Sequence, residues 1–171
     1  MLTLSTPKII TRGPYSVVGC YGTYEGMDEG PGWAAADAAF NARRGEVTNR
    51  ADDLTLGFMY RPHRDVPDIP AETKACFIGV EVTDLNHVPP GMAVTHFSAG
   101  EYVVVDCHGD TGAEAAEGVG TAIGFLESQW LSEHGYVEGD ACFGASRESA
   151  QRPPYIETVY MKLEKAGLSL Q

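Results

Sequence analysis

The sequence predicts an α+β protein built from two copies of a β-α-β-β unit. A strand motif occurs twice, a helical pattern follows each copy, and two strand-like runs follow each helix. Two such units are expected to pack their helices on one antiparallel sheet, or on two abutting sheets, with approximate two-fold symmetry. We therefore expect a single domain over residues 1–171, with halves of about residues 1–85 and 86–165.

The repeated motif is the most informative feature of the chain. Residues 13–22 read GPYSVVGCYG and residues 100–109 read GEYVVVDCHG, with six of the ten positions identical. Tyr and Val dominate both copies, so each copy is predicted to be a strand. The alignment pairs Cys20 with Cys107. We expect both thiols to be buried, reduced and equivalent in the two halves.

A helix is predicted after each copy of the motif. Residues 33–44 place Trp33, Ala36 and Phe40 on one face of the first helix. The second helix is longer, over residues 113–133, and His134 with Gly135 is predicted to end it. Its apolar residues recur at helical spacing. They are Val119, Ile123, Leu126 and Trp130.

Two strand-like runs follow each predicted helix. In the first half they are residues 54–60 (LTLGFMY) and 76–82 (CFIGVEV). In the second half they are residues 141–146 and 155–163, of which the latter (YIETVYMKL) is the clearer strand. Three stretches rich in Pro, Asp or Ser are predicted to be irregular. They are residues 61–73, 84–91 and 144–154.

The charge composition argues against nucleic acid as a partner. The chain has 24 acidic and 12 basic residues, for a formal net charge of −12. Phosphate binding relies on Lys and Arg, which this chain has in small number. The long-range field of an acidic protein favours cationic ligands. Solubility alone is the other explanation of the charge.

Features of the first 20 residues and of the cysteines predict a cytoplasmic protein. No apolar run approaches the roughly 18 residues that a membrane helix needs, so no membrane association is expected. The segment before Cys20 contains Lys8 and Arg12 and lacks the apolar region of a signal peptide. The four cysteines form no CxxC motif and are expected to stay reduced.

Nucleophilic and metal chemistry find little support in the sequence. Cys107 and His108 are neighbours on a predicted strand, so their side chains point to opposite faces. No Gly-x-Ser-x-Gly motif occurs, and no two histidines have the i, i+4 spacing of a helical zinc site. We expect no metal, no cofactor, and a binding protein rather than an enzyme.

Two carboxylates inside predicted strands are the strongest candidates for a binding site. Glu81 lies in FIGVEV and Glu157 lies in YIETVYM. Each either faces water or an arginine, or forms the floor of an aromatic pocket that attracts an organic cation. Aromatic residues are the candidates for the pocket walls, with core packing as the alternative for each. They are Tyr60, Phe97, Tyr102, Trp130, Tyr136, Tyr155 and Tyr160.

Several short segments occur in an order that resembles a known family. This order is FIGVEV, PGM, FSAGEY, WLS, GY and IETVY, within residues 77–160. It resembles the gyrase-inhibitor-like effector-binding family, which includes the ligand domains of AraC-type and MerR-type multidrug regulators and free-standing integron-cassette proteins. The resemblance covers about residues 1–165.

The resemblance implies a tandem β-α-β-β fold with an aromatic pocket and a buried glutamate that bind cationic, lipophilic compounds. Glu157 matches the pocket glutamate in the last strand. The chain departs from the family pattern at two positions. Val159 replaces an aromatic residue, although Tyr160 follows it, and Gly144 stands where many members carry a second acid.

We therefore expect a protein that binds a small organic ligand, cationic and lipophilic or aromatic, through the named acids and aromatic residues. One alternative is a hydrolase of strained, electrophilic natural products, in which Glu157 or Glu81 would deprotonate a water. Another alternative, implied by the same resemblance, is a protein-interaction module of the gyrase-inhibitor type. A protein partner or a homodimer is compatible with each of these functions.

Overall fold

A computed structural model describes residues 1–147 and 153–167 of the chain. It divides into two compact units. The first, here called the continuous unit, is Tyr15–Phe97. The second, the split unit, combines Met1–Pro14 with Ser98–Gln171. The boundaries therefore differ from the halves expected near residue 85, because the first residues of the chain belong with its second half.

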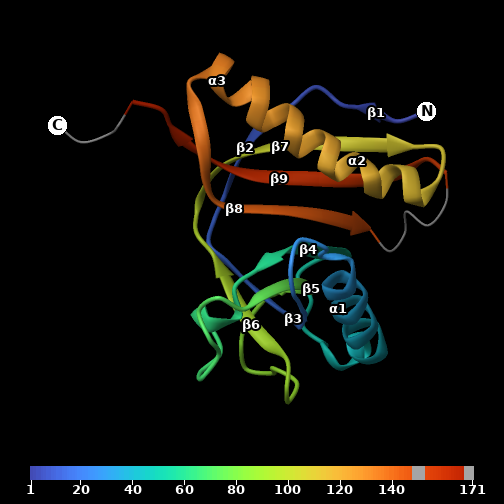
Figure 1. Cartoon of the computed structure of the whole chain (residues 1–171), viewed down its shortest axis with the longest axis vertical. Coiled ribbons are helices and arrows are strands. Elements are labelled where there is room, and N and C mark those ends of the chain that lie inside the picture. The colour runs from blue at the N-terminus through green and yellow to red at the C-terminus, as the bar shows by residue number, and fades with distance from the viewer. Residues whose placement is uncertain (148–152, 168–171) are drawn as a thin grey trace. The chain divides into compact units, whose positions relative to one another are not determined.

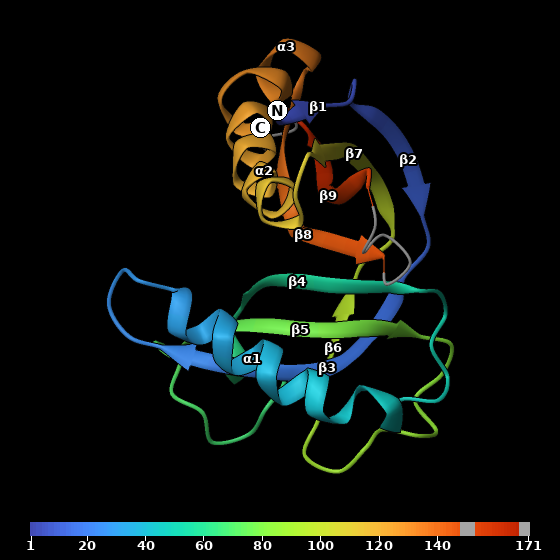
Figure 2. The same cartoon turned by 90° about the vertical axis from the view of Figure 1, so that its right-hand side faces the viewer.

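The continuous unit is an antiparallel sheet with one long helix. Its strands are β3 (Tyr15–Tyr24), β4 (Leu54–Tyr60), β5 (Lys74–Val82) and β6 (Ala93–Phe97). They lie in the order β4-β5-β3-β6. Helix α1 (Gly30–Arg43) crosses one face of this sheet, as Figure 2 shows.

Local sequence explains where α1 begins and what it buries. Pro31 lies in its first turn, where a proline has no hydrogen bond to lose. Ala36 and Phe40 are fully buried on the sheet-facing side, as their spacing predicted. Phe40 packs into a core with Val18 and Val80 from the two central strands. Two short 3₁₀ helices follow in the connections, at Arg44–Glu46 and Pro62–Arg64.

The strands of the split unit also pair in antiparallel fashion. Strands β1 (Thr3–Leu4) and β2 (Lys8–Arg12) both pair with β7 (Gly100–Gly109). Strand β7 also pairs with β9 (Tyr155–Lys165), which in turn pairs with β8 (Tyr136–Arg147). The sequence predicted β7 and β9. It did not predict the two N-terminal strands.

One helical stretch covers β7 and β9 of the split unit (Figure 1). It consists of α2 (Gly112–Phe125), a π-helical turn η3 (Leu126–Trp130) and α3 (Leu131–His134). The Thr111 side chain caps its start by accepting a hydrogen bond from the backbone N–H of Glu114, at 3.1 Å. Gly135 ends it in the left-handed conformation at φ 76°, as the sequence predicted.

The structure confirms the α+β prediction with two main helices, and each copy of the strand motif is a strand that leads into one of these helices. Gly22 ends its motif beneath the first turn of α1, where an added methyl group would lie 2.7 Å from Ala35 Cβ. Gly109 ends the other motif beneath the first turn of α2, where a methyl group would lie 2.5 Å from the Ala115 nitrogen. Only glycine permits both approaches.

The two aligned cysteines differ in burial, which corrects one expectation. All four cysteines are free thiols, and Cys107 is fully buried as expected. Cys20 is only half-buried. The difference arises because β1 pairs with β7 beside Cys107. In the continuous unit, β6 pairs with β3 only as far as Gly19, so no strand lies beside Cys20 on that side of β3.

Further differences from the sequence-based elements concern lengths. β8 extends from Tyr136 to Arg147, much longer than the predicted run, and part of the predicted loop 144–154 is therefore strand. Residues 148–152 lie outside the described residues. β6 was not predicted. No helix in the described part of the chain is long and apolar enough to cross a membrane.

Candidate functional site

Glu157 lies near the start of β9, on the side of the sheet that faces α2. The register places it opposite Cys107 on β7 and Ser146 on β8. Because side chains alternate along a strand, Glu157 shares its face with Val159 and Met161. Both of these are fully buried in the core beneath the helix. The carboxylate therefore continues an apolar row of side chains.

The Glu157 carboxylate is partly buried and lacks a polar partner. In residues 1–147 and 153–167 no side chain donates a hydrogen bond to it or forms an ion pair with it. Burial disfavours the charged form of a carboxyl group. It raises the pKa of Glu157 to about 7. Near neutral pH this site therefore exchanges a proton readily, unlike an ordinary glutamate.

The surroundings of Glu157 are tight and largely apolar. Where α2 crosses the sheet, an added methyl group at Gly118 would lie 2.9 Å from Cys107 Cβ. Tyr155, two residues before Glu157 on the same face, lies close to the start of α2, where a methyl group at Gly112 would be 3.7 Å from its ring. Glu157 is thus flanked by an aromatic ring and an aliphatic core.

A second acidic pair lies on the same side of this sheet. Glu138 on β8 lies beside the carboxyl group of Glu127 in the π-helical turn. Burial raises the pKa of Glu138, and the neighbouring Glu127 raises it further. Nearby, burial raises the pKa of the Cys142 thiol to about 12, with smaller contributions from both glutamates. The sequence did not predict this pair, because Glu127 belongs to the helical stretch and Glu138 to the strand after Gly135, and no sequence pattern brings the two together.

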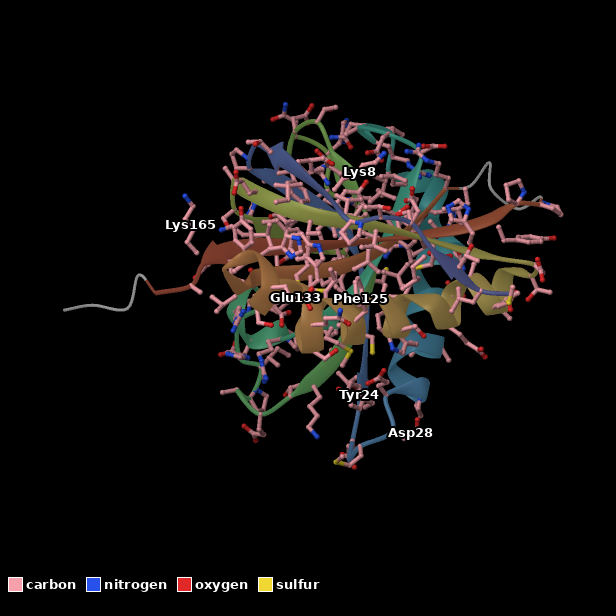
Figure 3. All side chains as sticks on the ribbon, turned by 90° about the horizontal axis from the view of Figure 1, so that it is seen from above. Lys8, Tyr24, Asp28, Phe125, Glu133 and Lys165 are labelled. Carbon is pink, nitrogen blue, oxygen red and sulfur yellow. The ribbon has the colours of Figure 1, made fainter. Side chains whose placement is uncertain are left out.

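The structure places Trp130 and Tyr136 away from Glu157. Their rings stack with centroids 6.0 Å apart, and Trp130 also stacks on His134 at 4.2 Å. Tyr136 pairs with Lys165, labelled in Figure 3, at the far end of β9 from Glu157. Through these two rings the C-terminal end of the helical stretch packs against β8.

Tyr102 and Tyr160 lie on the other face of the split unit's sheet. Phe143 stacks on Tyr160 at 5.0 Å and lies 6.3 Å from the ring of Tyr102. The Tyr102 hydroxyl donates a hydrogen bond to the Ser98 carbonyl at 2.9 Å. The Arg12 guanidinium lies 5.5 Å from the Tyr160 ring centroid. This cluster faces away from α2 and so does not surround Glu157.

Tyr60, Phe97 and Glu81 belong to the continuous unit, on the sheet face away from α1. Phe97 stacks on Tyr15 at 5.2 Å. The buried Tyr60 hydroxyl donates a hydrogen bond to Asp65 Oδ2 at 2.9 Å. Burial, and then this bond, raise the pKa of Tyr60. Glu81 is partly buried on β5, and its register partner on β3 is Val17.

Tyr60 also lines a surface cavity of about 390 Å³. The cavity carries two basic side chains, Arg61 and Lys74, against one acid, Glu72. The Lys74 ammonium donates a hydrogen bond to the Gly26 carbonyl at 2.7 Å. Such a lining is a poor match for a cation. This cavity is therefore a poor candidate for the recognition of positive charge, and neither Glu81 nor Glu157 lines it.

The predicted site residues thus fall into separate groups rather than one pocket lining within either unit. Glu157 and Tyr155 form one group beneath α2, Trp130 and Tyr136 a second, and Tyr102 and Tyr160 a third. Among the described residues, no group of three or more His, Cys, Asp or Glu side chains is arranged to hold a metal ion.

Comparison with known proteins gives matches at the level of structure only. No family model matches the chain, and no curated protein matches it. A structure of SAV2435 bound to tetraphenylphosphonium matches with a TM-score of 0.62 and 14% sequence identity, over 94% of each chain. A Vibrio cholerae integron cassette protein matches with a TM-score of 0.57 and 12% identity, over 95% of this chain and 99% of that one.

A third match is the C-terminal domain of EcmrR. It has a TM-score of 0.59 and 10% identity, over 94% of this chain and 98% of that domain. The shared architecture is an antiparallel α+β fold with two main helices. The chain therefore has the gyrase-inhibitor-like effector-binding fold that its segment order resembles.

Proposed function

We propose that this protein binds small organic cations and that Glu157 is the residue that recognises their charge. The observation that carries the proposal is a partly buried carboxylate without a polar partner in the described residues, on the helix-facing side of β9. A buried carboxylate is stable only when it is paired or protonated. A bound cation would supply the partner that residues 1–147 and 153–167 do not.

Three further observations support a cationic ligand. SAV2435, which shares the fold, has been solved with tetraphenylphosphonium, a lipophilic cation. The chain's formal net charge is −12, which attracts cations at long range. Glu127 and Glu138 add carboxyl groups on the same side of the split unit's sheet as Glu157.

We also propose that the protein acts in the cytoplasm, because all four of its thiols are free.

The expected strength of the interaction follows from Coulomb's law. A cation 4 Å from the carboxylate, at an effective dielectric constant near 20, is attracted by about 4 kcal/mol before desolvation is subtracted. Lipophilic surface on the ligand adds about 25 cal/mol for each Å² of apolar area removed from water.

The test compares one charged and one neutral ligand on two proteins. Glu157→Gln keeps the shape of the side chain and removes its charge. It should weaken tetraphenylphosphonium binding by about 2–4 kcal/mol, the range found when one member of a buried charge pair is lost. Neutral triphenylphosphine oxide should be affected much less. Isothermal titration calorimetry on both proteins measures the four affinities.

A matched control is available on the same strand. Glu164 is an exposed carboxylate near the end of β9, and Glu164→Gln removes the same charge without touching the buried position. It should leave both affinities within about twofold, as expected for a solvated charge. Equal losses for the two ligands in Glu157→Gln would show that Glu157 acts through packing, and charge recognition by this residue would be abandoned.

A second candidate function is favoured by one observation. A carboxyl group with a pKa of about 7 is suited to act as a general base near neutral pH. In a hydrolase Glu157 would deprotonate a water that opens a strained electrophilic ring. Hydrolysis of a cyclopropane-containing alkylator should then follow the ionisation of Glu157 and be lost in Glu157→Gln. A rate that the substitution does not change would eliminate this candidate.

A further inference from the structure

Strand β3 of the continuous unit has one edge that is only half covered. Along one side, β5 pairs with β3 from Ser16 to Tyr24. Along the other side, β6 pairs only with the first half of β3 and ends its pairing at Gly19, opposite Ala93. Within the continuous unit, the outward edge from Cys20 to Tyr24 therefore offers backbone N–H and C=O groups to an added strand.

A groove of about 640 Å³ lies beside this free edge. It is lined by residues of β3, by three alanines and Arg43 of α1, and by Gly91. The lining residues are Cys20, Tyr21, Gly22, Thr23, Ala35, Ala39, Ala42, Arg43 and Gly91. Tyr24, labelled in Figure 3, is the last residue of β3. A narrow groove with a free strand edge suits an extended peptide.

The equivalent groove of the split unit is filled by the chain itself. There β1 pairs antiparallel with the second half of β7, with Leu4 opposite Cys107. Leu2 and Leu4 pack against the core under α2. An added methyl group at Gly118 would lie 2.7 Å from Leu2 Cδ1, so that side chain reaches the helix. An extended segment with leucines at alternate positions therefore fits this kind of groove.

The two helices can be aligned through the glycines beneath them. Gly22 lies under Ala35 and Ala36, and Gly109 lies under the corresponding first turn of α2. Three residues beyond the position over the glycine is Ala39 in α1 and Gly118 in α2, so these two positions are equivalent. Ala39 carries the methyl group that Gly118 lacks, so the end of a leucine side chain on an incoming strand must turn aside to contact it, which a flexible side chain can do.

Charges at the two ends of the groove differ between the units. In the split unit the Met1 ammonium pairs with Asp110 and Glu114. The aligned positions of the continuous unit are Thr23 and Ala35, which carry no charge. That end of the groove is therefore not built to bind an amino group.

The opposite end of the groove carries a cation, Arg43. Its Nε and Nη2 bind Glu46, and Nη2 also donates to the Pro90 carbonyl at 2.8 Å. Its Nη1 makes no hydrogen bond to any residue that the structure describes. A methyl group added at Gly91 would lie 3.6 Å from this Nη1, so the free donors point to where β6 begins. An anionic group fits that end.

We propose that this groove binds the carboxyl-terminal segment of a partner protein as an added strand of the sheet. The segment would run antiparallel to β3, as β1 runs along β7, with aliphatic side chains at alternate positions. Its last residue lies opposite Cys20, because Gly19 is already paired with Ala93. Its terminal carboxylate then meets Arg43. This site is separate from Glu157 and does not depend on cation binding.

The probe is acetyl-Met-Leu-Thr-Leu, which copies the segment that fills the split unit, made with a free carboxylate and as the amide. Its binding to the full chain is measured by calorimetry. Ala39→Arg places a long side chain in the groove and should weaken binding at least tenfold. Ala38→Arg, at the neighbouring exposed position outside the groove lining, is the control and should change affinity less than twofold.

The carboxylate is tested separately from the groove. The acid peptide should bind about two- to fivefold more tightly than the amide, as expected for a partly exposed ion pair. Arg43→Gln should remove this difference. In wild type, bound peptide should slow the alkylation of Cys20 and leave Cys142, which lies in the split unit, unchanged.

Three outcomes would overturn the proposal. The first is the absence of saturable binding at 1 mM of either peptide. The second is binding that Ala39→Arg leaves intact. The third is concentration-dependent self-association in sedimentation experiments that Ala39→Arg abolishes, because the groove would then hold a second copy of this chain rather than a partner's terminus.

Discussion

Glu157 and Cys107 lie directly opposite each other on neighbouring strands beneath α2. Burial, with smaller contributions from the nearby Asp106 and Glu157, raises the pKa of the Cys107 thiol to about 11. Burial alone raises the pKa of Glu157 to about 7. Both groups are therefore uncharged below neutral pH, and Glu157 is the first to ionise as the pH increases.

The raised pKa of Glu157 predicts how stability changes with pH. The folded pKa of about 7 exceeds the ordinary value of 4.5, so the folded state holds a proton that the unfolded state has lost. Stability from this group is complete below pH 4.5 and is lost as the pH increases through 7. Relative to Glu157→Gln, wild type should lose up to about 3 kcal/mol between pH 4.5 and 8.

Urea unfolding of both proteins at several pH values measures this difference. All other titrating groups are common to the two proteins, so they cancel in the comparison. A stability difference that stays constant with pH would contradict a raised pKa at Glu157.

Cation binding should be linked to proton release. A bound cation favours the ionised carboxylate and lowers the pKa of Glu157 from about 7. Binding near pH 7 should therefore release up to one proton, and the affinity should fall as the pH is lowered further. Calorimetry at pH 7 in two buffers with different ionisation enthalpies counts the protons. The Glu157→Gln protein should release none, and an unchanged proton count in that variant would point to another group.

The Tyr60 hydroxyl should contribute to stability rather than to ligand binding. It is buried, and it donates a 2.9 Å hydrogen bond to Asp65. Tyr60→Phe keeps the ring packing and removes this bond to a charged acceptor, so it should lower the free energy of unfolding by about 1–2 kcal/mol. Tyr24→Phe is the control, because its hydroxyl forms no hydrogen bond within the described residues. Urea unfolding distinguishes the two.

The four thiols should react with alkylating reagents at different rates. Cys20 is half-buried, whereas Cys76 and Cys107 are fully buried and have pKa values of about 11. At pH 8 only about one in a thousand of the two buried thiols is ionised, and the thiolate is the reactive form. Iodoacetamide labelling followed by mass spectrometry should therefore find Cys20 modified well before Cys76 and Cys107. Rapid labelling of Cys107 would contradict its burial.

The repeated fold could be predicted from the sequence because its signals are local. Tyr and Val mark β3 and β7, and Gly22 and Gly109 end both copies because each following helix passes too close for a side chain. The apolar spacing of Trp33, Ala36 and Phe40 predicted α1 within a few residues.

The arrangement of the site could not be predicted, because it depends on pairing between distant segments. β1 and β2 pair with β7, which lies about a hundred residues further along the chain. The five residues of β2 mix polar and apolar side chains without a pattern that indicates β7 as the partner strand. Sequence reasoning grouped the aromatic residues by type. The structure separates them by sheet face, because alternation along β7 and β9 sends Tyr102 and Tyr160 away from Glu157.

The split unit has a consequence for the order of synthesis. Residues 1–14 are synthesised before β7, the strand that they join, which is completed only at Gly109. At about 5–20 residues per second, β2 waits on the order of 5 to 20 seconds for its partner. The continuous unit, Tyr15–Phe97, is complete before that moment. Its strands and helix are therefore all synthesised while the first strands still lack their partner.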